Sequence, residues 1–196
     1  MAGLFQKLEF EAFRKGITPR SKESRAWFMN KAKNLNVSRS KLMKEDPIEL
    51  RSRPAVGKMY MYFYDPKTKD TLPYYDRFPL ILLVDINKGG MTGLNLHYLP
   101  IRLRQKLFYS LLNRVNSRDM NEDTYIRMTY DFLKDNRAVK EYRPCFKKYL
   151  TQNIKGNIAQ IPASEWEVAV HLPLASFEKK DERTVHRESE RIIERF

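Results

Sequence analysis

The sequence predicts an α+β fold: a small antiparallel β-barrel, SH3-like in size, preceded by basic helices and carrying a helical insertion before its last strand. Three observations predict this fold. Residues 59–99 contain three strand-like segments joined by tight polar turns, and Pro100 begins a stretch in which leucines recur at helical spacing. Strand-like alternation returns at residues 166–172. Because the three earlier strands lack a closing partner, the last strand is expected to complete a barrel.

Length and composition indicate one domain with appendages. The chain has 196 residues, of which 42% are hydrophobic and 31% are charged, within the globular range. We expect a basic helical segment at 1–56, a barrel domain at 57–177 with its insertion at 101–155, and a charged C-terminal helix at 178–196. The longest apolar run, 79–84, is too short to cross a membrane. The single cysteine, Cys145, excludes an intramolecular disulfide and indicates a reducing compartment.

The N-terminal segment is expected to form short helices. Apolar residues at 3–13 have helical spacing, and this helix should stop at Gly16. Thr18 and Pro19 form a typical helix start, which predicts a second helix to about residue 34. Residues 37–44 continue the basic character as another helical turn, and Pro54 marks a linker.

The barrel strands follow from alternation and turn composition. Residues 59–64 alternate methionine or phenylalanine with tyrosine, 79–86 are almost wholly apolar, and 91–99 place leucines and a tyrosine on one face. Two glycines at 89–90 mark the turn between the second and third strands. Helices are then expected at 101–115, 124–134 and 144–150, a fourth strand at 166–172, and a terminal helix that docks weakly or awaits a partner.

The net charge of +13 is unevenly distributed. Residues 1–58 carry 14 basic against 6 acidic residues, and residues 101–155 carry 13 against 6, whereas the segment between them is balanced and the C-terminal segment is slightly acidic. Such a field attracts polyanions, of which nucleic acid is the most abundant in a cell. A solvated surface, an acidic protein partner or lipid headgroups would explain the same pattern.

No catalytic or metal site is predicted. The three histidines, His97, His171 and His186, have no metal-ligand spacing, and the first two are expected on strands. Cys145 follows a proline at the start of an apolar turn, where a small buried thiol is the default. The carboxylates do not form the acid and acid-x-lysine pair of a metal-dependent nuclease, which leaves that activity a distant alternative. No cofactor is expected.

Two basic clusters are the candidate DNA-binding residues, because lysine and arginine bind phosphates without sequence preference. They are Arg14, Lys15, Arg20, Lys22, Arg25, Lys31, Lys33, Arg39 and Lys41 in the first cluster, and Arg137, Lys140, Arg143, Lys147 and Lys148 in the second. The nearby aromatic residues are expected to pack in the core. The tyrosines at 60, 62, 64, 74 and 75 form a less favoured alternative, a platform on which bases stack.

Several longer strings resemble a known family. They are TPRSKESRAWF (18–28), GKMYMYFYDPKTKDTLPYYDRFPL (57–80), GLNLHYLP (93–100), YRPCFKKYL (142–150) and IPASEWEVAVHLPLASF (161–177). They resemble a virion protein of T4-like tailed bacteriophages, the DNA end protector family. The resemblance is scattered over residues 18–177 and carries no residue-level roles.

The resemblance implies a non-enzymatic head or neck protein that binds the ends of packaged double-stranded DNA and shields them from host exonuclease. It implies a location in the virion, with the host cytoplasm during assembly, and other virion subunits (portal, neck or tail proteins) as partners. No membrane partner is expected. The alternative is a connector, neck or baseplate assembly protein whose basic faces meet acidic subunits.

Overall fold

The computed structural model describes residues 3–19, 21–33, 35–44, 49–51, 54–113 and 143–195. The N-terminal part is helical, as predicted, with α1 at Leu4–Arg14, α2 at Lys22–Lys33 and α3 at Arg39–Leu42. The second helix begins later than Thr18 and Pro19 suggested. The Ser21 hydroxyl accepts a 3.0 Å hydrogen bond from the Ser24 N–H and so caps the first turn.

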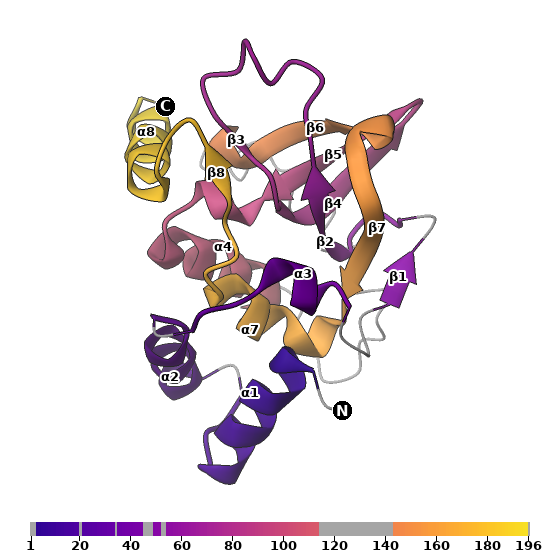
Figure 1. Cartoon of the computed structure of the whole chain (residues 1–196). Helices are drawn as coiled ribbons and strands as arrows, with labels where there is room; N and C mark the ends of the chain where they lie inside the picture. The colour runs from indigo at the N-terminus through magenta and orange to yellow at the C-terminus, as the bar shows by residue number, and fades with distance from the viewer. Residues whose placement is uncertain are drawn as a thin grey trace.

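A six-stranded antiparallel sheet forms the centre of the molecule (Figure 1). Its spatial order is β1-β7-β2-β4-β5-β6. The strands are β1 (Glu49–Arg51), β2 (Met59–Tyr64), β4 (Leu80–Asn87), β5 (Gly90–Asn95), β6 (Phe146–Leu150) and β7 (Ile154–Ile161). A separate two-stranded sheet pairs β3 (Tyr75–Asp76) with β8 (Phe177–Glu178). The fold class is therefore α+β.

The predicted barrel is wrong. Within the described residues the large sheet stays open, since its edge strands β1 and β6 each pair with a single neighbour, β7 and β5. The segment expected to close the barrel, residues 166–172, is instead the helix α7 (Trp166–His171). All six residues of α7 are buried, so the helix has no polar face that would reveal its period of 3.6 residues. Its apolar residues instead alternate in sequence as those of a strand do.

The segment after the expected insertion also differs from the prediction. Residues 146–150, expected within a helix, form β6 after the 3-10 turn η2 (Arg143–Cys145), and β7 was not predicted. The third predicted strand ends at Asn95, where the Asn95 side chain caps the 3-10 turn η1 (Leu96–Tyr98). Helix α4 (Ile101–Asn113) follows Pro100 as predicted, and the helix expected at 124–134 lies outside the described residues.

The two faces of the sheet carry different residues because side chains alternate along each strand. Met59 and Met61 of β2 belong to the main core, which α1, α2, α4 and α7 share. Tyr60, Tyr62 and Tyr64 point to the opposite face and form a second buried cluster with Tyr149. Because these three rings are buried, they do not form an exposed platform on which bases could stack. Figure 1 shows α7 between the sheet and the helices α1 and α2.

The C-terminal helix α8 (Glu182–Glu194) is docked on the domain. Val185 and Ser189 are completely buried, and the wholly buried Arg104 of α4 donates from Nη2 to Glu182 at 3.1 Å. Arg104 also donates from Nε to the Leu99 carbonyl at 2.6 Å, which ties the start of α4 to η1. No helix in the described part of the chain combines the length and apolar character that a bilayer crossing requires.

Candidate nucleic-acid interface

Several cations of the first predicted cluster make contacts within the fold, whereas others are exposed. Arg25 lies over the Tyr109 ring with its guanidinium carbon 3.4 Å from the ring centroid. Lys31 forms an ion pair with Glu11 and lies 5.5 Å from the Trp27 centroid. These contacts hold both cations against their neighbours, and the Glu11 carboxylate offsets part of the charge that Lys31 could offer a phosphate.

Arg39 is also used inside the fold. Its Nε donates to the Leu174 carbonyl at 2.8 Å, and its Nη2 donates to the Ala175 carbonyl. These bonds fasten α3 to the segment between α7 and β8. The most exposed cations of this cluster are Arg14, Lys15, Lys22 and Lys41. Lys15 Nζ lies 3.8 Å from Glu11 Oε1, the carboxylate oxygen that Lys31 also contacts. Arg20 and the side chain of Lys33 lie outside what the structure describes.

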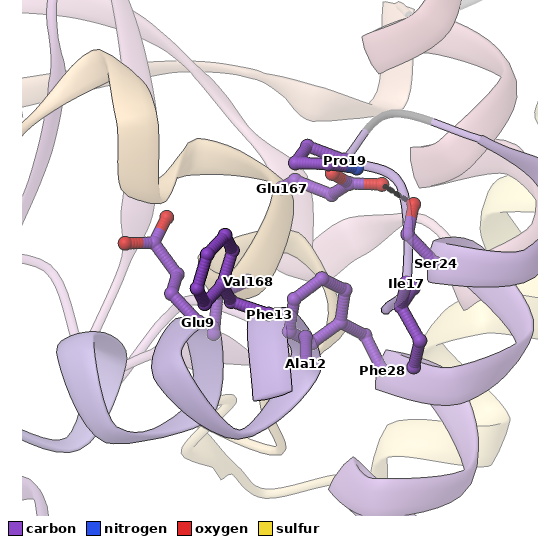
Figure 2. A pocket seen from close by; sticks show the side chains of 9 residues that line it. All are labelled: Glu9, Ala12, Phe13, Ile17, Pro19, Ser24, Phe28, Glu167 and Val168. Atoms are coloured by element: carbon purple, nitrogen blue, oxygen red, sulfur yellow. Dashed lines mark hydrogen bonds between the residues drawn. The ribbon is translucent and has the colours of Figure 1, made fainter. Parts of the chain in front are cut away.

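A cavity of about 540 Å³ lies between α1, α2 and α7 in this region. Figure 2 shows the Glu9 carboxylate on one side and the hydrogen-bonded pair of Ser24 and Glu167 on the other. Its lining includes these two acids and no lysine or arginine. Burial, followed by the charge of Glu167, raises the pKa of Glu9. Because both carboxylates would repel a phosphate, this cavity is unsuited to DNA.

The second predicted cluster is partly described. Arg137 and Lys140 lie outside the described residues, Arg143 is exposed in η2, and Lys147 and Lys148 point from β6. Lys148 is exposed, whereas Lys147 is half-buried with its Nζ 4.0 Å above the centroid of Tyr98. Burial lowers the pKa of Lys147. Among the described residues no carboxylate forms an ion pair with Lys147.

Lys147 and Lys148 line a cleft of about 370 Å³, here called the tyrosine-lysine cleft. The other residues of its wall come from the loop after β2, from β3, from η1 and from the end of β6. The lining residues are Tyr64, Pro66, Lys67, Thr68, Leu72, Pro73, Tyr74, Tyr75, Asp76, Tyr98, Lys147, Lys148, Tyr149 and Leu150. Three lysines thus face one carboxylate, and tyrosines supply much of the surface. The cleft therefore combines an excess of lysines with several aromatic side chains.

The single carboxylate of the cleft is fully engaged. Asp76 accepts hydrogen bonds from the backbone N–H groups of Phe78 at 3.0 Å and Ser176 at 3.1 Å. Its other oxygen lies 3.2 Å from the Asn95 amide nitrogen and 2.7 Å from His97 Nδ1. Asp76 therefore joins β3, β5, η1 and the start of β8, and it fixes the floor of the cleft.

The loop between β2 and β3, which projects from the sheet in Figure 1, forms the outer wall. Asn153 donates from its side chain to the Asp65 carbonyl at 2.7 Å, which holds the start of the loop. Lys179 donates to the carbonyls of Asp70 at 2.9 Å and Leu72 at 2.8 Å, which holds its end. Tyr74 lies against the Tyr98 and Phe177 rings, with Lys180 Nζ 4.8 Å from its centroid.

The residues weighed for catalysis have structural roles. His97 and His171 were expected on strands, but His97 lies in η1 beside Asp76, and His171 lies in α7, where its Nε2 is 2.7 Å from Gln105. Cys145 is buried, and burial raises the pKa of its thiol, which disfavours the thiolate. Within the described residues no three histidine, cysteine or acidic side chains gather as a metal site would require.

Sequence reasoning predicted Lys147 and Lys148 as DNA-binding residues but missed that they share a cleft with Lys67 and Tyr98. Tyr74 and Tyr75 were grouped with the tyrosines of β2, which are buried on the sheet. No spacing rule links residues 67, 74, 98 and 147, because the fold brings them together from four segments. The doubled tyrosine after a proline was the one local signal of a partly exposed aromatic pair.

Comparison with known protein families gives a match over nearly the whole chain. The family model described as "Phage T4 terminal DNA protecting protein" matches residues 6–192, nearly the whole chain. Neither the curated proteins nor the solved structures include a match to this sequence.

Proposed function

Because the chain belongs to the family of phage T4 terminal DNA protecting proteins, we propose that it binds the ends of linear double-stranded DNA and blocks exonucleases there. The observation that carries the proposal is the family match over residues 6–192. The family description names protection of DNA. On this proposal the protein acts by occupying the end rather than by chemistry on it.

The net charge of +13 supports binding without sequence specificity. Lysine and arginine contacts to phosphates release counterions, which gives affinity for any sequence and a steep dependence on salt. The exposed members of the two predicted clusters are suited to this work: Arg14, Lys22 and Lys41 on the helical segment, and Arg143 and Lys148 near β6. Arg25, Lys31 and Arg39 also have internal contacts, so we assign them a smaller share.

Protection of the packaged genome fits a place in the virion, at the head or neck, from which the protein accompanies the DNA end into the host. Virion subunits such as portal, neck or tail proteins would then be neighbours. Phe10 and Phe13 favour such a neighbour, because they lie one turn apart on α1 and are 62% and 77% exposed. A purely structural subunit, without DNA binding, is therefore the second candidate.

One experiment separates these functions. Purified protein is mixed with a linear duplex or with a covalently closed duplex of the same length, at about 50 and 200 mM salt, and exonuclease is added. The proposal expects steeply salt-dependent binding and selective protection of the linear form. Equal binding to both forms without protection would show that the protein binds DNA generally and does not protect its ends. Failure to bind either form at the higher salt would favour the structural subunit.

A further inference from the structure

The tyrosine-lysine cleft has the size of a single nucleotide. Its volume of about 370 Å³ falls at the lower end of small-molecule sites. A double helix is too wide to enter a cleft of this volume, since its major groove, which is only part of its width, already measures about 12 Å. The part of DNA that suits a cleft of this size is one unpaired nucleotide.

We propose that the cleft holds one unpaired nucleotide at the end of a DNA strand, with its base against Tyr74 and Tyr75 and its phosphate beside Lys147. This inference rests on the proposed function, since it names how the end is recognised. It makes the cleft the source of the preference for ends, while the exposed cations supply affinity for duplex of any sequence.

The chemistry of the lining suits both halves of a nucleotide. Tyr74 and Tyr75 line the cleft and are half-buried, so part of each side chain can contact a base. Tyr74 also contacts the rings of Tyr98 and Phe177 and the ammonium group of Lys180. Every base has a face that packs against an aromatic ring. Lys147 presents an ammonium group that no described carboxylate neutralises. Lys67 and Lys148 are exposed at the same cleft and can meet the neighbouring phosphates.

The acid in the cleft does not oppose this assignment. Both oxygens of Asp76 are occupied by hydrogen bonds from Phe78, Ser176, Asn95 and His97, and the residue is 3% exposed. The contrast with the cavity of Figure 2 is direct. There two carboxylates line the space without any lysine or arginine.

The size of the cleft explains why it would select ends. An internal base must be unpaired and unstacked before it can leave the helix, and this cost is least for a base that is already unpaired. A terminal base pair is stacked on one side only and frays more easily than an internal pair. A cleft that takes one nucleotide therefore favours a terminus without reading its sequence.

The first test measures affinity for an open duplex and for a dumbbell of the same sequence whose two ends are closed by loops. The variants are Tyr74→Leu, which removes the ring but keeps an apolar side chain, Lys147→Met, which keeps the stem, and Lys148→Ala at the exposed rim. Lys155→Met, an exposed lysine of β7 outside the cleft, is the matched control. Thermal melting confirms that each variant folds.

We expect Tyr74→Leu and Lys147→Met each to weaken binding to the open duplex about tenfold and to leave dumbbell binding nearly unchanged. Lys148→Ala should have a smaller effect in the same direction, and Lys155→Met should change both affinities equally. If folded cleft variants keep the wild-type preference for open ends, the cleft is not the end site. That result would leave the proposed function intact, whereas wild-type protein that binds no DNA would overturn both.

The second test locates the terminal base directly. Duplexes carrying 5-iodouracil at the terminal or at an internal position are bound and irradiated, and cross-linked peptides are identified by mass spectrometry. The proposal expects the terminal probe to cross-link to the peptide containing Tyr74 and Tyr75, and the internal probe not to do so. Cross-links from the terminal probe to other peptides alone would overturn the assignment.

Discussion

Asp76 holds together four segments that are distant in the sequence, and it does so with one buried carboxylate. Its oxygens meet two backbone N–H groups, the Asn95 amide and the His97 ring. Removal of the carboxylate would leave these donors buried without an acceptor, which is far more costly than the loss of one exposed hydrogen bond.

Asp76→Ala should therefore lower the free energy of unfolding by about 3 to 5 kcal/mol, measured by urea denaturation. Asp85→Ala is the matched control, because Asp85 is exposed on β4, and it should change stability by less than about 0.5 kcal/mol. Similar losses for the two variants would contradict the role assigned to Asp76.

Glu165, the residue directly before α7, predicts a pH dependence of stability. Burial and then the charge of Glu9 raise the pKa of Glu165 from 4.5 to about 7. Between these two values the folded protein binds a proton that the unfolded chain has released. Stability therefore falls as pH rises from about 4.5 to 7.

Glu165→Gln removes this cost, since glutamine stays neutral. The variant should be more stable than wild type by roughly 1 to 3 kcal/mol at about pH 8, and the gain should vanish near pH 4. Urea denaturation at the two pH values measures the difference, with the exposed Glu194→Gln as control. A gain of equal size at both pH values would show that the charge of Glu165 is not its cause.

At the scale of the elements, β6 depends on the close approach of Gly90. A Cβ atom at position 90 would lie 2.7 Å from the Tyr149 carbonyl oxygen, which is backbone and cannot rotate away. Gly90 pairs with Leu150 at the end of β6, the strand that carries Lys147 and Lys148. The geometry of the tyrosine-lysine cleft therefore depends on this glycine.

Gly90→Ala should destabilise the protein by about 2 kcal/mol or more and increase amide exchange along β6. Gly89→Ala is the control at the neighbouring position, where an added Cβ atom meets no other atom. Gly89 has a φ of 82° with open space around it, so only the left-handed backbone is strained, at about 1 kcal/mol. Loss of protection in β6 should accompany Gly90→Ala alone, and equal exchange in both variants would refute the clash.

The helices that sequence reasoning identified have one exposed face, and the strands that it identified show regular alternation or a long apolar run. Helices α1, α4 and α8 and strands β2 and β4 follow the predicted periodicities closely. Helix α7 is buried on all sides, so no polar stripe revealed its period of 3.6 residues, and it was mistaken for a strand. Strand β6 was mistaken for a helix because its five residues are too few to separate the two periods. The barrel prediction was wrong for the same reason, because the strand expected to close the barrel is the helix α7.

At the scale of the whole molecule, charge counts predicted a polyanion partner but not which cations would be available. Arg25, Lys31 and Arg39 look equivalent to Lys22 and Lys41 in the sequence, yet Tyr109, Glu11 and two backbone carbonyls engage the first three. The cleft was beyond sequence reasoning altogether, since its lysines and tyrosines become neighbours only through strand pairing and loop anchoring.

If the proposed function holds, the two exposed sets of lysines should make separable contributions to DNA binding. Lys22 and Lys41 lie on the N-terminal helical segment, and Lys67 and Lys148 lie at the tyrosine-lysine cleft. Reversal of either pair to glutamate changes the net charge of the molecule equally, so the long-range attraction of DNA falls by the same amount. Any difference between the two double variants must then come from local contacts.

For each phosphate contact that is lost, the slope of log affinity against log salt should become shallower by about 0.9. We expect both double variants to flatten the slope, by up to about 2 when both lysines contact phosphate. The cleft pair alone should also abolish the preference for open over closed duplex, because it adjoins the nucleotide site. If the helical pair removed that preference and the cleft pair preserved it, the end would be recognised by the helices, and the cleft would bind no DNA.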